Sequence, residues 1–341
     1  MRGVVFLGEK GLELREFADP TPEAGEVVLE MKASGMCGSD LVKRYRISKS
    51  QVGEPVIAGH EPCGIVVAIG PGVSENQAYD GMRAMVHHYR GCGVCKHCRV
   101  GWPQMCLNGH LTYGITAHGG HAKYMKVPAI TLVPLPEELS FEVGAAISCG
   151  TGTAYGALRR IGLSGCETIA IVGQGPVGLS ATQMAKVMGA RVIALDVSEP
   201  RLLLAKEFGA DVTINPKKDD PVMAIKELTH GEGTELALDC SGSAEGRLAA
   251  VRATRTWGKI LLVGEGGQLT VDVSSDLLRR QLTLVSSWTF STAGQMECAQ
   301  FVADRRIPVE KIFTQRYRLE EAEKAYREFD TQSTGKGVFM L

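Results

Sequence analysis

The sequence predicts an α/β protein with two domains, one with a doubly wound parallel sheet and one mostly of antiparallel β structure. From about residue 150, continuous apolar strands alternate with helical stretches, as in a parallel sheet covered on both faces. Before that point, Gly and Pro punctuate short apolar runs about every ten residues, as in antiparallel β structure. The chain of 341 residues is also long enough for two domains.

Composition is that of an ordinary globular chain and argues against several functions. Hydrophobic residues make up 44% of the chain, charged residues 22%, and the formal net charge is −1. Without a long basic run, the chain lacks an electrostatic footprint for nucleic acid. The start, "MRGVVFLGEKGLELREF", fits neither a signal nor a transit peptide, and no apolar run approaches membrane-spanning length. We therefore expect a cytoplasmic protein with no nucleic-acid or membrane partner.

The individual elements follow from local patterns. The first region carries the apolar runs "GEVVLEMKASG", "CGIVVAIGPGV", "GMRAMVHH" and "AKYMKVP". In the second, the strand "ETIAIVG" precedes the helix-like "PVGLSATQMAKVMGA", and "RVIALD" precedes a helix at 199–208 with Ser198 as N-cap, Pro200 in its first turn and Gly209 after its end. The strands "DVTIN", "ELALDCSG", "KILLVGE" and "LTLVSS" follow, and beyond about residue 288 come an amphipathic helix, "EEAEKAYREFD", and a closing strand, "GKGVFML".

The segment "GQGPVG" follows an expected strand and opens an expected helix, which is typical of a Rossmann dinucleotide-binding turn. Gly173, Gly175 and Gly178 permit a tight turn and a close approach of a pyrophosphate to the helix N-terminus. Asp196 ends the next strand, where a carboxylate binds the adenosine ribose and repels the 2′-phosphate of NADP. Each feature alone also fits an ordinary turn or a surface carboxylate. The combination predicts NAD as the cofactor.

Further cofactor-binding candidates surround this turn. Pro176 lies within it, and Val263 and Gly264 lie in "KILLVGE". Arg201 either contacts the adenosine end of NAD or is a solvated helix residue.

Four of the ten cysteines lie in one segment, "CGVCKHCRVGWPQMC". Cys92, Cys95, Cys98 and Cys106 are spaced C-x2-C-x2-C-x7-C, and in a reducing compartment such clusters indicate a metal site rather than disulfides. Four thiolates suit tetrahedral zinc with no open position, so we expect a structural zinc. Ligand type alone also allows an iron–sulfur cluster, and a zinc ribbon fits the spacing less well.

A second set of ligand candidates is scattered along the chain. "GMCGSD" contains Cys37, "GHEPCG" contains His60, and "ISCGTGTAYG" contains Cys149. A lone buried Cys is usually a small core residue and a lone His is usually only hydrogen-bonded. Here, however, Gly flanks all three segments and polar residues accompany each candidate. Three ligands leave a fourth zinc position open, as in a catalytic site.

These motifs, in this order, resemble the zinc-dependent medium-chain alcohol/polyol dehydrogenases over the whole chain. "GHEPCG" is similar to their G-H-E-x-x-G signature, and the four-cysteine loop, "CGTGTAYGAL" and the NAD-binding block follow it. The resemblance implies a mostly β GroES-like catalytic domain at 1–150, with 289–341 returning to it, and a Rossmann NAD-binding domain at 151–288. It also implies two zinc ions per chain and a homotetramer or dimer.

The resemblance assigns roles to particular residues. Cys37, His60 and Cys149 are expected to bind catalytic zinc, with Glu61 as an occasional ligand. Zinc as a Lewis acid would lower the pKa of an alcohol substrate, which then loses hydride to NAD. Ser39 would accept the alcohol proton, and Asp40 would orient His60. Thr153 and Val177 match positions that contact the nicotinamide end.

The chain departs from its relatives near the expected substrate. Val42 replaces a histidine that ends the proton relay in many of them, so protons must leave by another path. "HGGHAKYM" has His118, His121 and Lys123 in place of other residue types, and "HHY" (87–89) precedes the cysteine loop. His88 and His121 are therefore candidates for substrate contact, or else surface or hydrogen-bonded loop histidines. In the pocket they would favour a polyol, sugar alcohol or hydroxy acid derivative.

Two other functions compete with an NAD-dependent zinc alcohol/polyol dehydrogenase. A zinc-independent quinone or enone reductase of the same superfamily would lack the scattered ligands, which are all present. A non-enzymatic zinc-binding scaffold would leave the dinucleotide motif unexplained. The three functions predict two, no and one zinc per chain, respectively.

Overall fold

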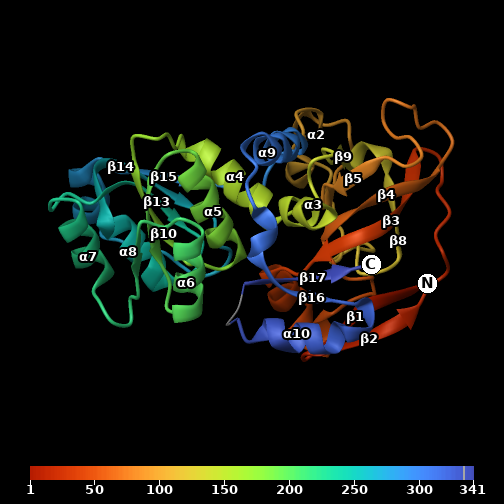
Figure 1. Ribbon diagram of the computed structural model, residues 1–341, viewed down its shortest axis with the longest axis horizontal. Helices are drawn as coiled ribbons and strands as arrows, with labels where there is room; N and C mark the ends of the chain where they lie inside the picture. Colours follow the sequence, from red (N-terminus) through yellow and green to blue (C-terminus); the bar gives the residue numbers. More distant parts are fainter. Residues whose placement is uncertain (333–334) are drawn as a thin grey trace. The chain divides into compact units, whose positions relative to one another are not determined.

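The computed structural model describes residues 1–332 and 335–341, which form two compact units (Figure 1). Unit 1 contains residues 1–152, 291–332 and 336–341, and unit 2 consists mainly of residues 153–290. The sequence places the corresponding changes at 150/151 and 288/289. The C-terminal tail therefore packs in the same unit as the N-terminal half, and each unit has its own sheet and core.

Unit 2 contains a six-stranded, fully parallel sheet, which confirms the predicted α/β class. Its order is β12-β11-β10-β13-β14-β15, so the winding direction reverses between β10 and β13. In open parallel sheets, the carboxyl edge at such a reversal is where ligands bind. The strands are β10 (Thr168–Val172), β11 (Arg191–Leu195), β12 (Val212–Ile214), β13 (Thr234–Asp239), β14 (Thr254–Leu262) and β15 (Thr283–Ser286).

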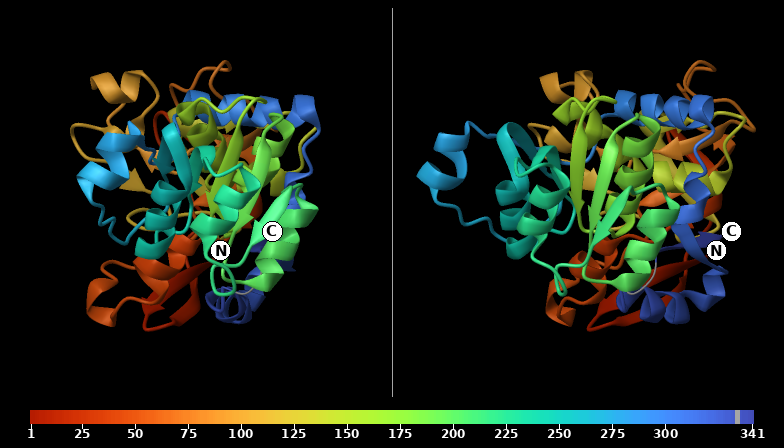
Figure 2. Two further views of the ribbon diagram at one scale, coloured as in Figure 1. Left: turned by 90° about the vertical axis from the view of Figure 1, so that its left-hand side faces the viewer. Right: turned by 60° about the vertical axis from the view of Figure 1, so that its left-hand side comes forward.

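Helices flank this sheet on both faces (Figure 2). They are α4 (Gly150–Ile161), which begins in unit 1, α5 (Pro176–Val187), α6 (Glu199–Glu207), α7 (Pro221–Leu228) and α8 (Ala244–Ala253). Right-handed crossovers place α5 and α6 on one face and α7 and α8 on the other. The two covered faces explain the continuous apolar runs of the central strands. Ser198 is the N-cap of α6, which ends one residue before the expected position, at Glu207.

Unit 1 is built on a seven-stranded sheet with the order β16-β17-β3-β4-β5-β9, while β8 pairs with β3. Most pairs are antiparallel, as predicted, but β16 and β17 run parallel, a departure that local patterns do not reveal. The strands are β3 (Glu26–Gly35), β4 (Glu61–Ile69), β5 (Arg83–Val86), β8 (Tyr124–Pro128), β9 (Leu132–Pro134), β16 (Phe313–Tyr317) and β17 (Lys336–Met340).

Smaller elements complete unit 1. Two further antiparallel pairs join β1 (Arg2–Gly8) to β2 (Gly11–Glu16) and β6 (Tyr89–Arg90) to β7 (Leu111–Thr112). The helices are α1 (Gly38–Asp40), α2 (Lys96–Arg99), α3 (Phe141–Ile147), α9 (Thr292–Arg305) and α10 (Ala322–Asp330). The helix α10 buries Tyr326 and Phe329 in an aromatic core with Phe6, Tyr45 and Phe339.

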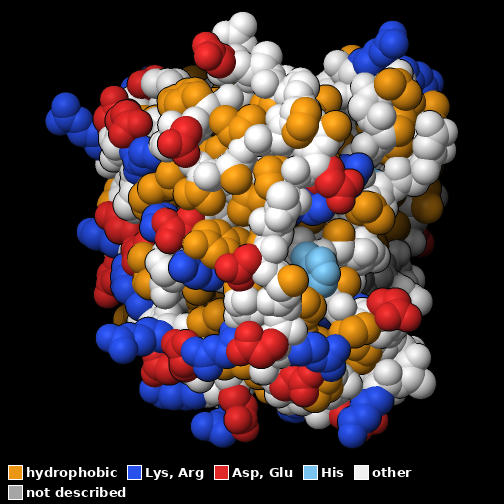
Figure 3. Space-filling view, turned by 90° about the vertical axis from the view of Figure 1, so that its right-hand side faces the viewer, with side chains coloured by type: hydrophobic (Ala, Val, Ile, Leu, Met, Phe, Trp, Pro, Cys, Tyr) orange, Lys and Arg blue, Asp and Glu red, His pale blue; other side chains and the backbone are white. Residues whose placement is uncertain are grey.

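The mixed surface charges fit the near-zero net charge of the chain, and the helix lengths fit the absence of long apolar runs from its sequence. Lys and Arg side chains lie among Asp and Glu side chains on the face shown in Figure 3. Within the described parts of the chain, every helix is too short or too polar to cross a bilayer.

Candidate functional site

Three segments of unit 1 bring the scattered ligand candidates together. Cys37 follows β3, His60 directly precedes β4, Glu61 begins β4, and Cys149 follows α3 by two residues. One ligand atom from each of these four residues lies within 4.8 Å of all the others. The Sγ atoms of Cys37 and Cys149 are 4.0 Å apart. Residues separated by as many as 112 positions thus form one compact donor set.

Two glycines make this approach possible. Gly35 pairs with Glu61 across β3 and β4, and a Cβ on Gly35 would lie 2.0 Å from Glu61 Oε2. Gly59, directly before His60, has a φ of +89°, and a Cβ there would lie 2.3 Å from His121 Nδ1. Any larger residue would displace the carboxylate or the imidazole, and at Gly59 it would also strain the backbone. Steric restriction therefore explains why the G-H-E motif of this chain begins with glycine, at Gly59.

Hydrogen bonds fix the ring of His60. Its Nδ1 lies 2.9 Å from Asp40 Oδ1, and its Nε2 lies 3.2 Å from Ser39 Oγ. The backbone N–H of Cys37 donates to Asp40 Oδ2 at 2.9 Å. Asp40 is 1% exposed, so these contacts are shielded from water. In this arrangement His60 Nε2 faces the donor set, and His60 Nδ1 is hydrogen-bonded to the Asp40 carboxylate.

Burial and proximity perturb the two thiols in opposite directions. The hydrogen bond with Cys149 holds the pKa of Cys37 well below its usual range, and the nearby His60 adds to this effect. The pKa of Cys149 is raised well above its usual range by the hydrogen bond to Cys37 and by burial. The pair thus favours one thiolate and one thiol, and a divalent cation between them would stabilise both thiolates.

A buried ion pair lies beside the thiols. Lys336 Nζ, at the start of β17, is 2.5 Å from Glu61 Oε1, and the two side chains are 1% and 0% exposed. Burial raises the pKa of Glu61 to about 8, although Lys336 opposes this shift. Among the described residues, the other carboxylate oxygen, Oε2, has no hydrogen-bond partner. A buried acceptor without a donor is costly unless a cation or another group approaches it.

This donor set fits zinc. Two thiolates and one imidazole nitrogen are the ligand types that catalytic zinc takes, and the orphan oxygen of Glu61 is positioned as a further donor. The carboxylate–histidine pair of Asp40 and His60 is the usual support for a zinc-bound imidazole.

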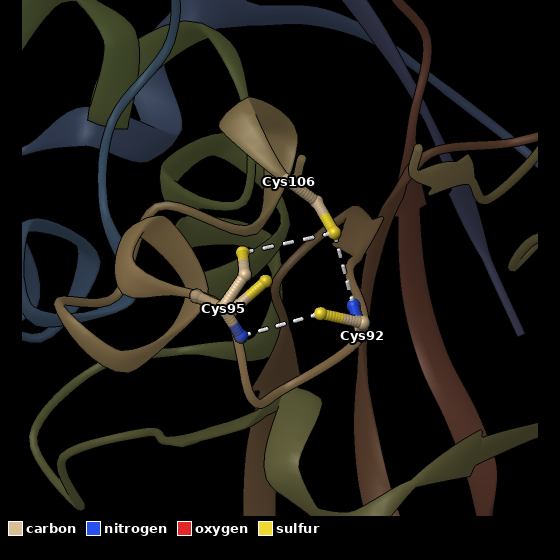
Figure 4. Close-up of side chains that lie close together, drawn as sticks. Cys92, Cys95 and Cys106 are labelled. Atoms are coloured by element: carbon tan, nitrogen blue, oxygen red, sulfur yellow. Dashed lines mark hydrogen bonds between the residues drawn. The ribbon is translucent and has the colours of Figure 1, made fainter. Parts of the chain in front are cut away.

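The four-cysteine loop forms a second donor set, partly shown in Figure 4. The thiols of Cys92, Cys95, Cys98 and Cys106 lie within 4.8 Å of one another. Cys92 N–H donates to Cys106 Sγ at 3.3 Å, and Cys95 N–H donates to Cys92 Sγ at 3.4 Å. Hydrogen bonds from backbone N–H groups lower the pKa of Cys95 to about 6. Four sulfurs in this arrangement fit a closed tetrahedral zinc site.

The glycine-rich turn of unit 2 connects β10 to α5. Gly173 has a φ of +89°, and a Cβ there would lie 2.8 Å from Ser241 Cα. A Cβ on Gly178 would lie 1.8 Å from the carbonyl oxygen of Gly173, so this glycine allows close helix–strand packing. Gly175 is the N-cap of α5, followed by Pro176 and Val177, and a Cβ on it would meet no described atom within 4 Å. The turn is thus open where a pyrophosphate would approach.

The other cofactor candidates of unit 2 follow the carboxyl ends of neighbouring strands. Asp196 follows β11, accepts hydrogen bonds from Gln174 N at 2.6 Å and Ser198 N at 2.8 Å, and is 8% exposed. Arg201 lies 4.0 Å from Asp196 Oδ2 and is only 14% exposed, unlike a solvated helix residue. Val263 and Gly264 follow β14, and both N–H groups donate to Asp239 O. Thr153 is buried in α4.

The two loop histidines lie in different surroundings. His88 is 2% exposed, its Nδ1–H donates to Ser148 O at 2.7 Å, and its ring centre is 5.5 Å from that of His60. His121 is fully buried, with Nδ1 2.7 Å from Ser34 Oγ and Nε2 2.7 Å from Tyr326 OH. His88 therefore borders the donor set, whereas both nitrogens of His121 bond to the protein. For His121 the geometry favours the hydrogen-bonded alternative over substrate contact.

Two residues of this site are absent from the sequence-based candidates. Lys336 is a charged residue at the first position of an otherwise apolar closing strand, a signal that could have identified it. Tyr326 lies among apolar positions of α10, where an aromatic residue is ordinarily read as core.

Known proteins resemble both units. Residues 23–137 match the family model "Alcohol dehydrogenase GroES-like domain", and residues 176–304 match "Zinc-binding dehydrogenase". The chain is 40% identical to an uncharacterized zinc-type alcohol dehydrogenase-like protein, YphC, from Escherichia coli, over 97% of the chain and 96% of the relative. It is 31% identical to L-threonine 3-dehydrogenase from Pyrococcus horikoshii, over 97% and 95%. Among solved structures, an NAD-dependent alcohol dehydrogenase has a TM-score of 0.88 at 29% identity, with 100% of both chains covered.

Proposed function

We propose that Cys37, His60 and Cys149 hold the catalytic zinc of this chain, which belongs to the zinc-dependent medium-chain alcohol dehydrogenase family. The protein is an oxidoreductase that uses zinc and NAD and interconverts an alcohol or polyol with the corresponding carbonyl compound. The observation that supports the site is the convergence of four ligand atoms within 4.8 Å. Glu61 serves as an occasional ligand through its orphan oxygen.

The residues around the zinc and the substrate have separate roles in this proposal. When bound, zinc would supply Lewis-acid chemistry that lowers the pKa of the substrate hydroxyl, and NAD would supply the hydride acceptor. Ser39 accepts the hydroxyl proton, because its Oγ lies 3.2 Å from the metal-binding nitrogen of His60. Asp40 holds His60 in the ligating orientation. Val42 is 54% exposed and cannot carry a proton, so the proton that Ser39 passes on would have to leave by another path.

We further propose how unit 2 binds NAD. The turn of Gly173, Gly175, Pro176 and Gly178 receives the pyrophosphate, and Asp196 with Arg201 receives the adenosine ribose. Thr153 and Val177 contact the nicotinamide end, and Val263 and Gly264 are further cofactor-binding residues. Asp196 would repel a 2′-phosphate, so NAD should give the higher kcat/KM.

The substrate is a polar alcohol in this proposal. His88 borders the donor set and offers a polar ring where a pocket for a long aliphatic alcohol would be apolar. Burial and the neighbouring His60 and His87 hold the pKa of His88 well below its usual range, so it faces substrate as a neutral imidazole.

Assembly and location complete the proposal. The second site, made by Cys92, Cys95, Cys98 and Cys106, holds a structural zinc, giving two zinc ions per chain. These thiols remain reduced in the cytoplasm, where we place the protein. The chain assembles as a homotetramer or homodimer.

The test combines metal analysis with turnover. Purified protein should contain two zinc ions per chain and reduce NAD with members of a panel of alcohols and polyols. Cys37→Ala and His60→Ala should each remove one zinc and lower kcat at least about 1,000-fold, because the Lewis acid is lost. Cys166→Ala, which alters an exposed cysteine outside both donor sets, is the matched control. Full turnover in both ligand variants would contradict the zinc assignment.

A further inference from the structure

A chain of buried hydrogen bonds continues from the His60–Asp40 pair toward the C-terminal helix. Tyr326 OH, from α10, donates to Asp40 Oδ2 at 3.0 Å. His121 Nε2 lies 2.7 Å from Tyr326 OH, and its Nδ1 lies 2.7 Å from Ser34 Oγ. These hydrogen bonds thus link His60 to Ser34 through residues up to 286 positions apart in the sequence, all within unit 1.

Each member of this chain is shielded from water. Ser34, His121 and Tyr326 are 0% exposed, Asp40 is 1% exposed and His60 is 2% exposed. The rings of Phe6 and Phe339 pack against Tyr326 and His121, with centre distances of 4.8 Å and 4.7 Å. A hydroxyl in such an apolar site is costly unless it is fully hydrogen-bonded. A phenylalanine would fill the same space without this cost, so the phenol of Tyr326 calls for an explanation beyond packing.

The geometry permits one consistent placement of protons. Tyr326 has a single O–H proton and donates it to Asp40, so its oxygen accepts from Nε2–H of His121. Nδ1 of His121 then accepts from the Ser34 hydroxyl. Burial lowers the pKa of His121 to about 4, in agreement with this neutral form.

The same placement extends to the metal ligand. With Oδ2 occupied by Tyr326 and by Cys37 N–H, Asp40 accepts the Nδ1–H of His60 at Oδ1. The proton is thereby held on Nδ1, and the lone pair of His60 Nε2 faces Cys37 and Cys149.

We propose that Tyr326 is a positioning residue for the zinc ligand His60, acting through Asp40 and itself oriented by His121 and Ser34. The proposal rests on the proposed function, because it assumes that His60 binds zinc. His121 also contacts the backbone before His60, where a Cβ on Gly59 would lie 2.3 Å from Nδ1. The ring therefore supports His60 by two routes, a hydrogen-bond chain and a direct packing contact.

The first experiment measures zinc loss from the loaded protein. Tyr326→Phe removes the hydroxyl and keeps the ring, so one zinc per chain should transfer to a chelator about 3- to 10-fold faster, below the full effect of losing a direct partner of the histidine. The other zinc, in the four-cysteine loop, should leave at the wild-type rate. Tyr317→Phe is the matched control, because it removes a phenol that donates to Glu328 at 2.6 Å in the same core. Its rates should match those of the wild type.

A second measurement separates positioning from general destabilisation. With Co²⁺ in place of zinc, Tyr326→Phe should shift the visible absorption bands of the catalytic site, whereas Tyr317→Phe should not. His121→Phe should give the same shift, and the double variant should add little to the change in zinc release, because both replacements break one chain. If Tyr326→Phe does not fold, the His121→Phe comparison still stands.

The outcomes distinguish this proposal from the proposed function. Wild-type zinc release and unchanged Co²⁺ bands in Tyr326→Phe and His121→Phe would overturn the positioning role while leaving the enzyme intact. Retention of both zinc ions and full turnover in His60→Ala would instead overturn the assignment of His60 itself.

Discussion

At the residue scale, Lys336 and Glu61 form an ion pair whose loss should be measurable. Both side chains are almost fully buried, at 1% and 0% exposure, so Lys336→Met leaves the buried Glu61 beside the thiols without its partner. We expect the free energy of unfolding of the metal-free protein to fall by about 3 kcal/mol. Lys336→Met/Glu61→Gln should recover most of this loss, because no buried charge remains. Urea denaturation measures the free energy of unfolding of both variants. A Lys336→Met variant as stable as the wild type would contradict the expected contribution of the ion pair.

His121 should make stability depend on pH. Its pKa is lowered from 6.5 to about 4, so the unfolded chain binds more protons between these values. Stability is therefore complete above about pH 6.5 and is lost as the pH falls toward 4, with about 2 kcal/mol lost by pH 5. His121→Phe should lack this contribution and show a shallower loss between pH 7 and pH 5. Equal slopes in the two proteins would show that His121 is not buried in its neutral form.

At the element scale, the four-cysteine loop should be a structural unit separate from turnover. Its apolar residues Val94, Val100 and Leu107 are 64% to 66% exposed, so the segment has little core to hold it. Cys106→Ser should remove one zinc, make the loop sensitive to protease and leave the catalytic zinc bound. Metal analysis and limited proteolysis test this together. Loss of both zinc ions from a folded variant would mean that the two sites are coupled.

The turn before α5 should control NAD affinity without affecting zinc. Gly178→Ala places a Cβ 1.8 Å from Gly173 O, so the helix must move away from β10. We expect KM for NAD to rise at least about 10-fold, since the N-terminal N–H groups no longer meet the pyrophosphate. Gly175→Ala, where a Cβ meets no described atom within 4 Å, should alter folding less but still obstruct the dinucleotide. Zinc content should stay constant in both.

The elements also show how far sequence patterns reach. Alternating strands and helices predicted the parallel sheet of unit 2, because burial on both faces leaves a continuous apolar run. The four-cysteine spacing likewise predicted a donor set, because its ligands are local. The parallel pairing of β16 with β17 was not predictable, since a strand's own pattern does not specify its partner. Tyr326 was missed for the same reason: periodicity assigns it to a buried face, but its bond to Asp40 spans 286 positions.

At the scale of the whole molecule, β15 offers an edge through which two copies can pair. It is the last strand of the unit 2 sheet, and Leu284 within it is 38% exposed. Val273 and Leu278, on the segment before it, are 54% and 61% exposed. A strand edge with exposed apolar side chains is a template for pairing with another chain, and a second copy of this one would satisfy it.

We therefore expect replacement of Leu284 by Glu to shift the assembly toward the 36.6 kDa single chain. A buried charge at the paired edge costs several kcal/mol unless it finds a partner, so the dissociation constant should rise at least about 100-fold. Leu203→Glu is the control, because Leu203 is 65% exposed on α6. This helix packs beside β11 and β12, which lie toward the edge of the sheet opposite β15. Light scattering over a concentration series gives the mass, and zinc content verifies folding. An unchanged mass in Leu284→Glu would place the subunit contact elsewhere on the surface.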